Sequence, residues 1–415
     1  MREMKDSGIS WVGEIRKEWS VWRNKYIFKI TKDIVLPSKS YQLLSLTTTG
    51  IKEKDENDNG GKVPENYDGY QIVKEDDLVM CLFDLDCSAV FSGLSPYNGM
   101  ISPAYKVLKV KKRIANVQYY RYWFNYVGSK RFYKQYSKSL RFTLNADEFN
   151  RLFSLLPPLT EQQRIAEFLD RECGKIDGLK ADIQAQIDTL EQYKRSIITE
   201  AVTHGLNPSA PMKDSGIPWV GQFPTHWTKK KGKYILRYMS KPVKQDDGVI
   251  TCFRDGEVTL RSNRREDGFT MADKEIGYQG VDVGDLVVHG MDGSAGAIGI
   301  SDSRGKASPV LNVLNTKQNK KYIMYYLRSM AYGEVFTALS TGIRVRSCDL
   351  RWNKLAELLY PLPPIDEQNN IVNYIDEQIA QTNEIIADKK SQIETLDGYK
   401  KSLIYEYVTG KKEVV

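Results

Sequence analysis

Two acidic residues, Asp84 and Asp292, are the first candidates for a catalytic role. They end two similar segments, YQIVKEDDLVMCLFD (70–84) and YQGVDVGDLVVHGMD (278–292). A carboxylate matched across the two halves in this way could belong to a nuclease site. No supporting Glu-x-Lys pattern accompanies either aspartate. Solvated surface is therefore the preferred interpretation of both.

Other signatures of catalysis are missing. The chain has no GxxxxGK[ST] phosphate loop, no HExxH and no GxSxG, and GSAGAIG (293–299) lacks the spacing of a dinucleotide fingerprint. Both Pro-Pro pairs follow leucine, so the adenine-methyltransferase signature is absent too. Three scattered histidines and five cysteines without a CxxC pair predict neither a metal site nor a disulfide framework. A binding protein is favoured, with an enzyme of unrecognised site as an alternative.

The chain contains one pattern twice. MKDSGISWVGEIRKEW (4–19) returns as MKDSGIPWVGQFPTHW (212–227), and PPLTEQQRI, beginning at Pro157, returns as PPIDEQNNI at Pro363. A period near half the chain predicts two homologous domains. Between the repeated segments the halves diverge, with strand-like alternation, one helical stretch each and then strand-like SLRFTL (139–144) or GIRVRS (342–347). We expect two α+β domains.

Composition narrows the class. The chain has 415 residues, 41% of them apolar, and a net charge of +7. No apolar run approaches the ~18 residues of a membrane span, and the N-terminal segment lacks the apolar core of a signal peptide, so a cytoplasmic protein is expected. The mild positive charge and mixed aromatic and cationic residues suit either nucleic acid or a protein interface.

Each half ends in a long helical pattern. Leucine or isoleucine recurs every seven residues in the first, and the second follows it without a gap but less regularly, because Thr382 and Lys389 interrupt the stripe. Leu179 and Tyr193 lie near the alternating positions of the first helix. We expect an antiparallel coiled coil with a pseudo-two-fold axis. Its predicted core residues are Leu169, Ile176, Ile183, Leu190, Ile197, Ile379, Ile386, Ile393 and Leu396.

The chain resembles the specificity subunit of type I restriction–modification systems over essentially its whole length. The resemblance rests on LLPPLTEQQRIAEFLD (155–170) and PLPPIDEQNNIVNYID (361–376), each of which joins a divergent domain to a long helix. The charged Lys389 departs from a regular helix seam. The resemblance implies four regions: a first target-recognition domain (1–155), a central helical region (156–205), a second target-recognition domain (206–360) and a C-terminal helical region (361–415).

The resemblance also implies a non-catalytic DNA-binding subunit. Each domain would read one half of a bipartite, asymmetric target in double-stranded DNA, with the helices setting the spacer. Two methyltransferase subunits would dock on the helical regions, and restriction subunits would join them. S-adenosylmethionine, ATP and magnesium are expected on these partners and no cofactor on this chain. Partner-binding residues are expected in the two Pro-Pro elements: Pro157, Pro158, Glu161, Gln162, Pro363, Pro364, Glu367 and Gln368.

Five arginines are the predicted DNA contacts. Arg141 and Arg344 stand in the matching strand-like pieces, and Arg346 follows on the same strand face. Arg264 and Arg265 belong to the loop RSNRRED. Arginine can pair with guanine in a bidentate manner or hold phosphate. The alternative for each is an ordinary surface charge paired with a nearby carboxylate.

A coiled-coil scaffold that joins two protein-binding domains is the rival interpretation of the whole chain. The mild net charge and the aromatic content are compatible with it. The two interpretations differ in salt dependence, because contacts with DNA phosphates make affinity fall steeply as salt rises.

Overall fold

The structure, a computed structural model, divides into two units. Unit 1 contains Met1–Ile183 and Ser391–Val415, and unit 2 contains Gln184–Lys390. Each unit therefore combines one α+β domain with part of both long helices. The residues that the structure describes are 3–35, 41–54, 67–264, 276–339 and 350–414.

A four-stranded antiparallel sheet lies at the centre of each domain. The strand order is β4-β11-β8-β9 in unit 1 and β16-β23-β20-β21 in unit 2, which is the same topology. The predicted pair of homologous α+β domains is thus confirmed. The strands are β4 (Phe28–Thr31), β11 (Lys106–Val110), β8 (Leu78–Met80) and β9 (Ser92–Leu94), and β16 (Leu236–Tyr238), β23 (Leu311–Thr316), β20 (Leu286–His289) and β21 (Ile298–Ile300).

Short hairpins and helices surround the sheet of unit 1. Strand pairs β1-β2, β5-β6, β7-β10 and β3-β12 are all antiparallel. The elements are β1 (Met4–Asp6), β2 (Glu14–Arg16), β3 (Ser20–Arg23), α1 (Asn24–Ile27), β5 (Leu44–Thr47), β6 (Gly50–Glu53), β7 (Gln71–Val73), β10 (Gly99–Ile101), α2 (Val117–Ser129), η2 (Phe132–Tyr136), α3 (Ala146–Arg151) and β12 (Phe153–Leu156).

Unit 2 repeats these pairings as β13-β14, β17-β18, β19-β22 and β15-β24. The elements are β13 (Met212–Asp214), β14 (Gln222–Pro224), β15 (Thr228–Lys231), η3 (Gly232–Tyr234), β17 (Ile250–Cys252), β18 (Val258–Leu260), η4 (Arg261–Asn263), β19 (Gln279–Val281), η5 (Gly293–Ala295), β22 (Gly305–Ala307), α5 (Lys320–Tyr332), α6 (Val335–Ala338), α7 (Trp352–Glu357) and β24 (Leu359–Leu362).

The main domain helices, α2 and α5, begin at matching asparagine caps. The Asn116 side chain accepts a hydrogen bond from the backbone N–H of Tyr119, and Asn319 caps α5 in the same way. Both helices are rich in aromatic residues and are packed on the domain side, with Tyr119, Trp123 and Tyr322 fully buried. Because such side chains each bury a large apolar area, these helices form the main part of each core.

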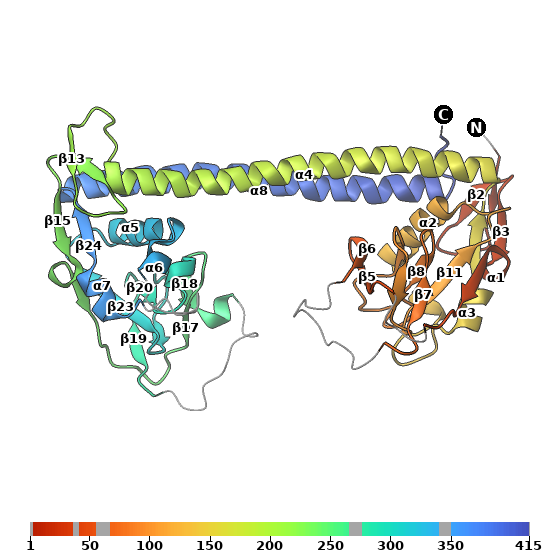
Figure 1. Cartoon of the computed structure of the whole chain (residues 1–415), viewed down its shortest axis with the longest axis horizontal. Helices are drawn as coiled ribbons and strands as arrows, with labels where there is room; N and C mark the ends of the chain where they lie inside the picture. The colour runs from red at the N-terminus through yellow and green to blue at the C-terminus, as the bar shows by residue number, and fades with distance from the viewer. Residues whose placement is uncertain (1–2, 36–40, 55–66, 265–275, 340–349, 415) are drawn as a thin grey trace. The chain divides into compact units, whose positions relative to one another are not determined.

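The two long helices are α4 (Leu159–His204) and α8 (Ile365–Val408), and they run side by side within each unit (Figure 1). In unit 1, Lys400 Nζ lies 2.6 Å from a carboxylate oxygen of Asp177. In unit 2, Lys194 Nζ donates to Asn383 Oδ1 at 2.8 Å, and Lys389 bonds Gln186. Residue numbers rise along α4 as they fall along α8, so the predicted antiparallel pairing is confirmed in each unit.

Along α4, the residues that face α8 recur at alternating intervals of four and three residues. All nine predicted core residues are buried or half-buried. The alternating positions of α4 are Cys173, Lys180, Ile187, Lys194 and Ala201, which are also buried or half-buried. The interpretation of Leu179 and Tyr193 as near-seam residues was wrong, since these side chains are 53% and 50% exposed.

A charged network holds one edge of unit 2. Arg304 pairs with Asp247 and Asp282, and Lys241 pairs with Asp282 and Asp285. Hydrogen bonds from Lys241 and Arg304 lower the pKa of Asp282 to about 2. The Arg304 guanidinium likewise lowers the pKa of Asp247. These carboxylates bind protons less readily in the folded state than in the unfolded chain.

We therefore expect unit 2 to lose stability on acidification. A carboxylate with a lowered folded pKa stabilises the fold fully above its unfolded pKa of about 3.9, and this contribution is lost as the pH falls towards about 2. Thermal unfolding of the chain between pH 5 and pH 2.5 should show it. Arg304→Met should make the transition less dependent on pH in this range. An unchanged pH profile in the variant would contradict the role of the network.

Candidate functional site

The two Pro-Pro elements form the junction between each domain and the helix that leaves it. Gln162 is fully buried, and its amide donates to the backbone oxygens of Ile114 and Pro157 at 2.9 and 2.8 Å. Its Oε1 accepts the backbone N–H of Asn116, directly before α2, at 2.8 Å. One side chain thus joins the start of α4 to the start of α2.

Unit 2 repeats this junction. Gln368 is fully buried and donates to Pro363 O at 2.9 Å, while its Oε1 accepts from the backbone N–H of Asn319 at 3.0 Å. Gln368 and Pro363 lie 206 residues after Gln162 and Pro157, and the capping residue Asn319 lies 203 residues after Asn116. Buried amides with all these bonds in place fix the direction in which each helix leaves its domain.

The glutamate before each glutamine holds a tryptophan. Glu161 accepts a hydrogen bond from Trp19 Nε1 at 2.9 Å, and Glu367 accepts one from Trp227 Nε1 at 3.0 Å. The second oxygen differs between the units. Glu161 pairs with Arg16 at 2.6 Å, whereas Glu367 bonds His226 Nε2 at 2.7 Å.

The end of the other long helix is held in the same region of each unit. Tyr119 donates its hydroxyl to Val408 O at 3.0 Å, and Tyr322 donates to Val202 O at 3.2 Å. Burial raises the pKa of both hydroxyls well above the ordinary value, so both remain protonated donors. The same frame is therefore built twice, from a domain, the start of one long helix and the end of the other.

These contacts bear on the eight residues expected to bind partners. Gln162 and Gln368 have no exposed surface, and the structure uses both inside the protein. Glu161 and Glu367 are half-buried and engaged with the tryptophans. Pro157 and Pro363 are buried as well, whereas Pro158 and Pro364 are exposed. The docking role of these elements stays a prediction.

The predicted DNA contacts fall into three groups. Arg141 is exposed, and the described contacts give its side chain no ion pair. Arg264 pairs with Asp255 at 2.6 Å and Glu257 at 3.0 Å, and these hydrogen bonds raise its pKa. For Arg264 the structure thus favours the alternative of a surface charge paired with carboxylates. Arg265, Arg344 and Arg346 lie outside the described residues.

The segment around Arg141 is a turn and not the predicted strand. Ser137 Oγ donates to Thr143 O at 2.9 Å, and the backbone N–H of Thr143 donates to Ser139 Oγ at 2.7 Å. Phe142 has a φ of +46°, which no strand allows. Serine and threonine side chains can bond nearby backbone groups and so compete with strand pairing. Residues 137–143 are called the 137–143 turn below.

A shallow hollow with a volume of about 530 Å³ borders this turn. Its lining combines cations with aromatic rings, and Trp11 stacks on Phe132 with ring centroids 4.3 Å apart. Sequence reasoning singled out only Arg141 in this region. The available signal was a run of cations without an acidic residue between Gly128 and Ala146. The cations are Lys130, Arg131, Lys134, Lys138 and Arg141.

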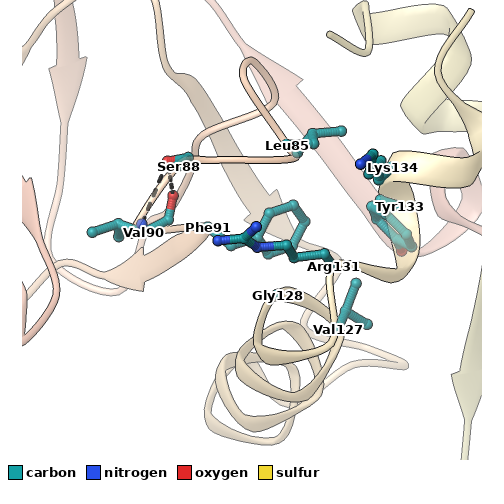
Figure 2. A pocket seen from close by; sticks show the side chains of 9 residues that line it. All are labelled: Leu85, Ser88, Val90, Phe91, Val127, Gly128, Arg131, Tyr133 and Lys134. Carbon is teal, nitrogen blue, oxygen red and sulfur yellow. Dashed lines mark hydrogen bonds between the residues drawn. The ribbon is translucent and has the colours of Figure 1, made fainter. Parts of the chain in front are cut away.

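Unit 1 also has a smaller pocket, and Figure 2 shows the side chains that line it. Arg131 and Lys134 line both. Arg131 has a φ of +52° and donates to the backbone oxygen of Asp86, so it ties the start of η2 to the loop that follows β8. In that loop Ser88 Oγ donates to Val90 O at 2.7 Å. The basic side of the hollow is therefore anchored to the domain core.

Two further properties concern the described part of the chain. Three or more histidine, cysteine, aspartate or glutamate side chains nowhere come together there as metal ligands would. None of the helices in it is both long and apolar enough to cross a membrane.

Known proteins show the same organisation. A type I restriction enzyme specificity subunit, MjaX, of Methanocaldococcus jannaschii is 22% identical over 441 residues, which covers 97% of this chain and 96% of the relative. A chain from a structure on the complex assembly and conformational transition of the type I R-M system matches with a TM-score of 0.66 and 12% identity. That match covers 96% of this chain and 99% of the other. No protein-family model matches.

The fold, with two α+β domains and two long helices, is similar to that of a chain in a structure of a type I R-M system. The chain is similar to the specificity subunits of these systems along its whole length, which confirms the resemblance indicated by its repeated motifs. The HsdS subunit from Thermoanaerobacter tengcongensis also matches, at 13% identity over 96% of this chain and 98% of its own, with a TM-score of 0.47.

Proposed function

We propose that the chain is the sequence-recognising subunit of a type I restriction–modification enzyme. Each domain reads one half of a bipartite DNA target, and the chain itself performs no catalysis. The observation that carries the proposal is a frame built twice with the same hydrogen bonds around domains whose surfaces differ. A repeated frame positions the two domains in equivalent ways, and different surfaces suit two different half-sites.

The difference between the surfaces is clearest after the main domain helix. In unit 1 the segment Lys130–Tyr136 carries three cations, Lys130, Arg131 and Lys134, and no acid. In unit 2 the corresponding described residues, Gly333–Leu339, carry Glu334 and no cation. Because the two domains present different charges at equivalent places, an asymmetric target is expected. Arginine and lysine in unit 1 would contact phosphates or the base edges of guanine.

The proposal extends to partners. Two methyltransferase subunits dock on the helical regions and bind S-adenosylmethionine. Restriction subunits, which use ATP and magnesium, complete the enzyme. Full-length similarity to a relative described as a specificity subunit supports this assignment, as does the likeness in fold to a chain of a type I R-M assembly. The helices set the spacer between half-sites.

The function is tested by producing the full chain with the methyltransferase subunit of its own system and mapping methylated adenines. We expect one asymmetric bipartite target, and no methylation by the chain alone. Binding of the complex to a duplex with this target should weaken steeply with salt, with a slope of about −0.9 per phosphate contact.

The rival functions predict other results. A scaffold between two protein-binding domains would show no salt-dependent binding to duplex DNA. An enzyme with an unrecognised site would modify DNA without partner subunits. Either result would overturn the proposed function.

A further inference from the structure

The 137–143 turn carries a leucine that the protein leaves entirely in solvent. The exposed fraction of Leu140 is 101%, whereas the next most exposed large hydrophobic side chain of the described residues, Ile276, reaches 76%. A single exposed leucine is by itself ordinary. The way in which the turn holds Leu140 sets it apart.

The turn is fixed by bonds within itself and to the loop after β8. Besides the two bonds of Thr143, the backbone N–H of Phe142 donates to Ser139 O at 3.0 Å. Asp84 N donates to Arg141 O at 3.1 Å and Leu85 N to Phe142 O at 3.2 Å. Leu140 is therefore presented on an ordered support and not on a loose loop.

The left-handed backbone conformation of Phe142 determines which side chains of the turn face the domain and which face solvent. With a φ of +46°, Phe142 directs its ring to the domain, where it packs against the core of unit 1 and under Lys134, with Nζ 4.5 Å from the ring centroid. A bulky residue adopts this backbone conformation only when its surroundings enforce it. The conformation keeps Phe142 inside and leaves Leu140 outside.

The surroundings of Leu140 are cationic. Lys138 and Arg141 flank it in the sequence, and Lys130, Arg131 and Lys134 line the hollow beside the turn. The described contacts give none of these five side chains an ion pair. Asp84 and Asp86 on the adjoining loop are the nearest acids along the supporting segment.

An exposed leucine surrounded by cations without ion pairs suits a polyanionic ligand that also carries apolar groups. A protein partner would be expected to meet a contiguous apolar patch, whereas the aromatic rings of the hollow are half-buried and Leu140 is flanked by the exposed Lys138 and Arg141. Duplex DNA offers both features, because its phosphates attract the cations and its grooves expose thymine methyl groups and base steps to apolar side chains.

We infer that Leu140 makes an apolar contact with base pairs of the half-site read by unit 1, while the cations around it hold the phosphates. The inference rests on the proposed function. Two contacts share this chemistry: the methyl group of a thymine in the major groove, and a base step that the side chain enters as a wedge.

The test uses the full chain in complex with its methyltransferase subunit and a duplex that carries the mapped target. Leu140→Ala should weaken binding about tenfold and relax the choice at one position of one half-site. Leu140→Met keeps an apolar tip and should bind as the parent does. Leu206→Ala removes another exposed leucine, in the linker of unit 2 between the end of α4 and β13, and serves as the control.

The salt dependence separates Leu140 from the cations. Leu140→Ala should leave the slope of log K against log salt unchanged, because no phosphate contact is lost. Lys134→Ala should make the slope shallower by about 0.9. Circular dichroism melting checks the fold of each variant, and we expect no change for Leu140→Ala because its side chain is fully exposed.

Two DNA probes distinguish the forms of contact. If Leu140 touches a thymine methyl, deoxyuridine at that position weakens the parent complex and leaves Leu140→Ala unaffected. If it enters a base step, 2-aminopurine at the step becomes brighter with the parent and not with the variant.

The result that overturns the inference is a Leu140→Ala complex with the affinity and the sequence choice of the parent. Failure of the proposed function is distinguishable, because the parent complex itself would then show no salt-dependent binding to the duplex.

Discussion

Glu161→Ala is expected to destabilise unit 1 by about 3–5 kcal/mol, because it leaves the buried Arg16 without its counter-ion. The Arg16 side chain is only 5% exposed, and its Nη1 lies 2.6 Å from Glu161 Oε1. Glu413, which is 44% exposed, lies 3.9 Å from the same nitrogen, so it is a more distant and more solvated counter-ion than Glu161. The substitution also removes the acceptor of the buried Trp19 N–H.

The matched control is Glu367→Ala in unit 2. Trp227 loses the same hydrogen bond, but the other partner is His226, whose side chain is 49% exposed and can be solvated. A loss of about 1–3 kcal/mol is expected, as for an unsatisfied buried donor. The repeat thus supplies two versions of one junction, in which the second glutamate oxygen contacts a buried arginine in unit 1 and a half-exposed histidine in unit 2.

Hydrogen exchange followed by mass spectrometry can measure each unit separately. Peptides of α2 should exchange faster in Glu161→Ala, while peptides of α5 keep the parent rate. Replacing both members of the pair, as Arg16→Met with Glu161→Gln, should restore most of the protection, because no buried charge then lacks a partner. Equal losses in Glu161→Ala and Glu367→Ala would show that the burial of Arg16 does not matter.

The fold was predictable because it depends on patterns that survive without tertiary context. The heptad of isoleucine and leucine in α4 and the repeat of the Pro-Pro elements are periodicities of the sequence itself. The alternate seam positions were not predictable. Lys180 and Lys194 read as solvent residues, yet they are half-buried and bond Asp397 and Asn383 on the partner helix.

The site was predictable only in part. The Glu-Gln pair was recognised as a motif, but its bonds reach Arg16 and Trp19, which are more than 140 residues away in the sequence. The 137–143 turn was mistaken for a strand because alternation in SLRFTL outweighed the local bonding capacity of its serines and threonine. Leu140 had no signal at all, since the exposure of a leucine depends on the backbone that carries it.

Exchanging residues 31–150 for the matching segment of a relative should replace one half of the DNA target and leave the other half unchanged. Binding to the original target should fall by about 10³-fold or more, because several base pairs are mismatched at once and each costs about 1–3 kcal/mol. The exchanged segment contains the 137–143 turn, the basic hollow except for Trp11, and the loop after β8.

The frame limits the choice of donor. Several residues inside the exchanged segment hold the frame outside it, and three of them serve as markers: the Asn116 backbone N–H bonds Gln162, the Tyr119 hydroxyl bonds Val408 O, and Trp123 Nε1 donates to Ser154 Oγ at 3.0 Å. A relative with the same three residue types at these positions should give a folded chimera. A chimera that lacks them is expected to lose the junction and not only its specificity.

The reciprocal exchange of residues 239–356 is the control for the other unit. Methylated adenines are mapped for the parent and both chimeras in complex with the same methyltransferase subunit. We expect each chimera to keep the half-site that the other one changes, with the spacer the same in all three, because α4 and α8 are untouched. If either exchange altered both half-sites, the two units would not read DNA independently. The frame contacts of Gln162 and Gln368 would then not prevent a change in one domain from altering the half-site of the other.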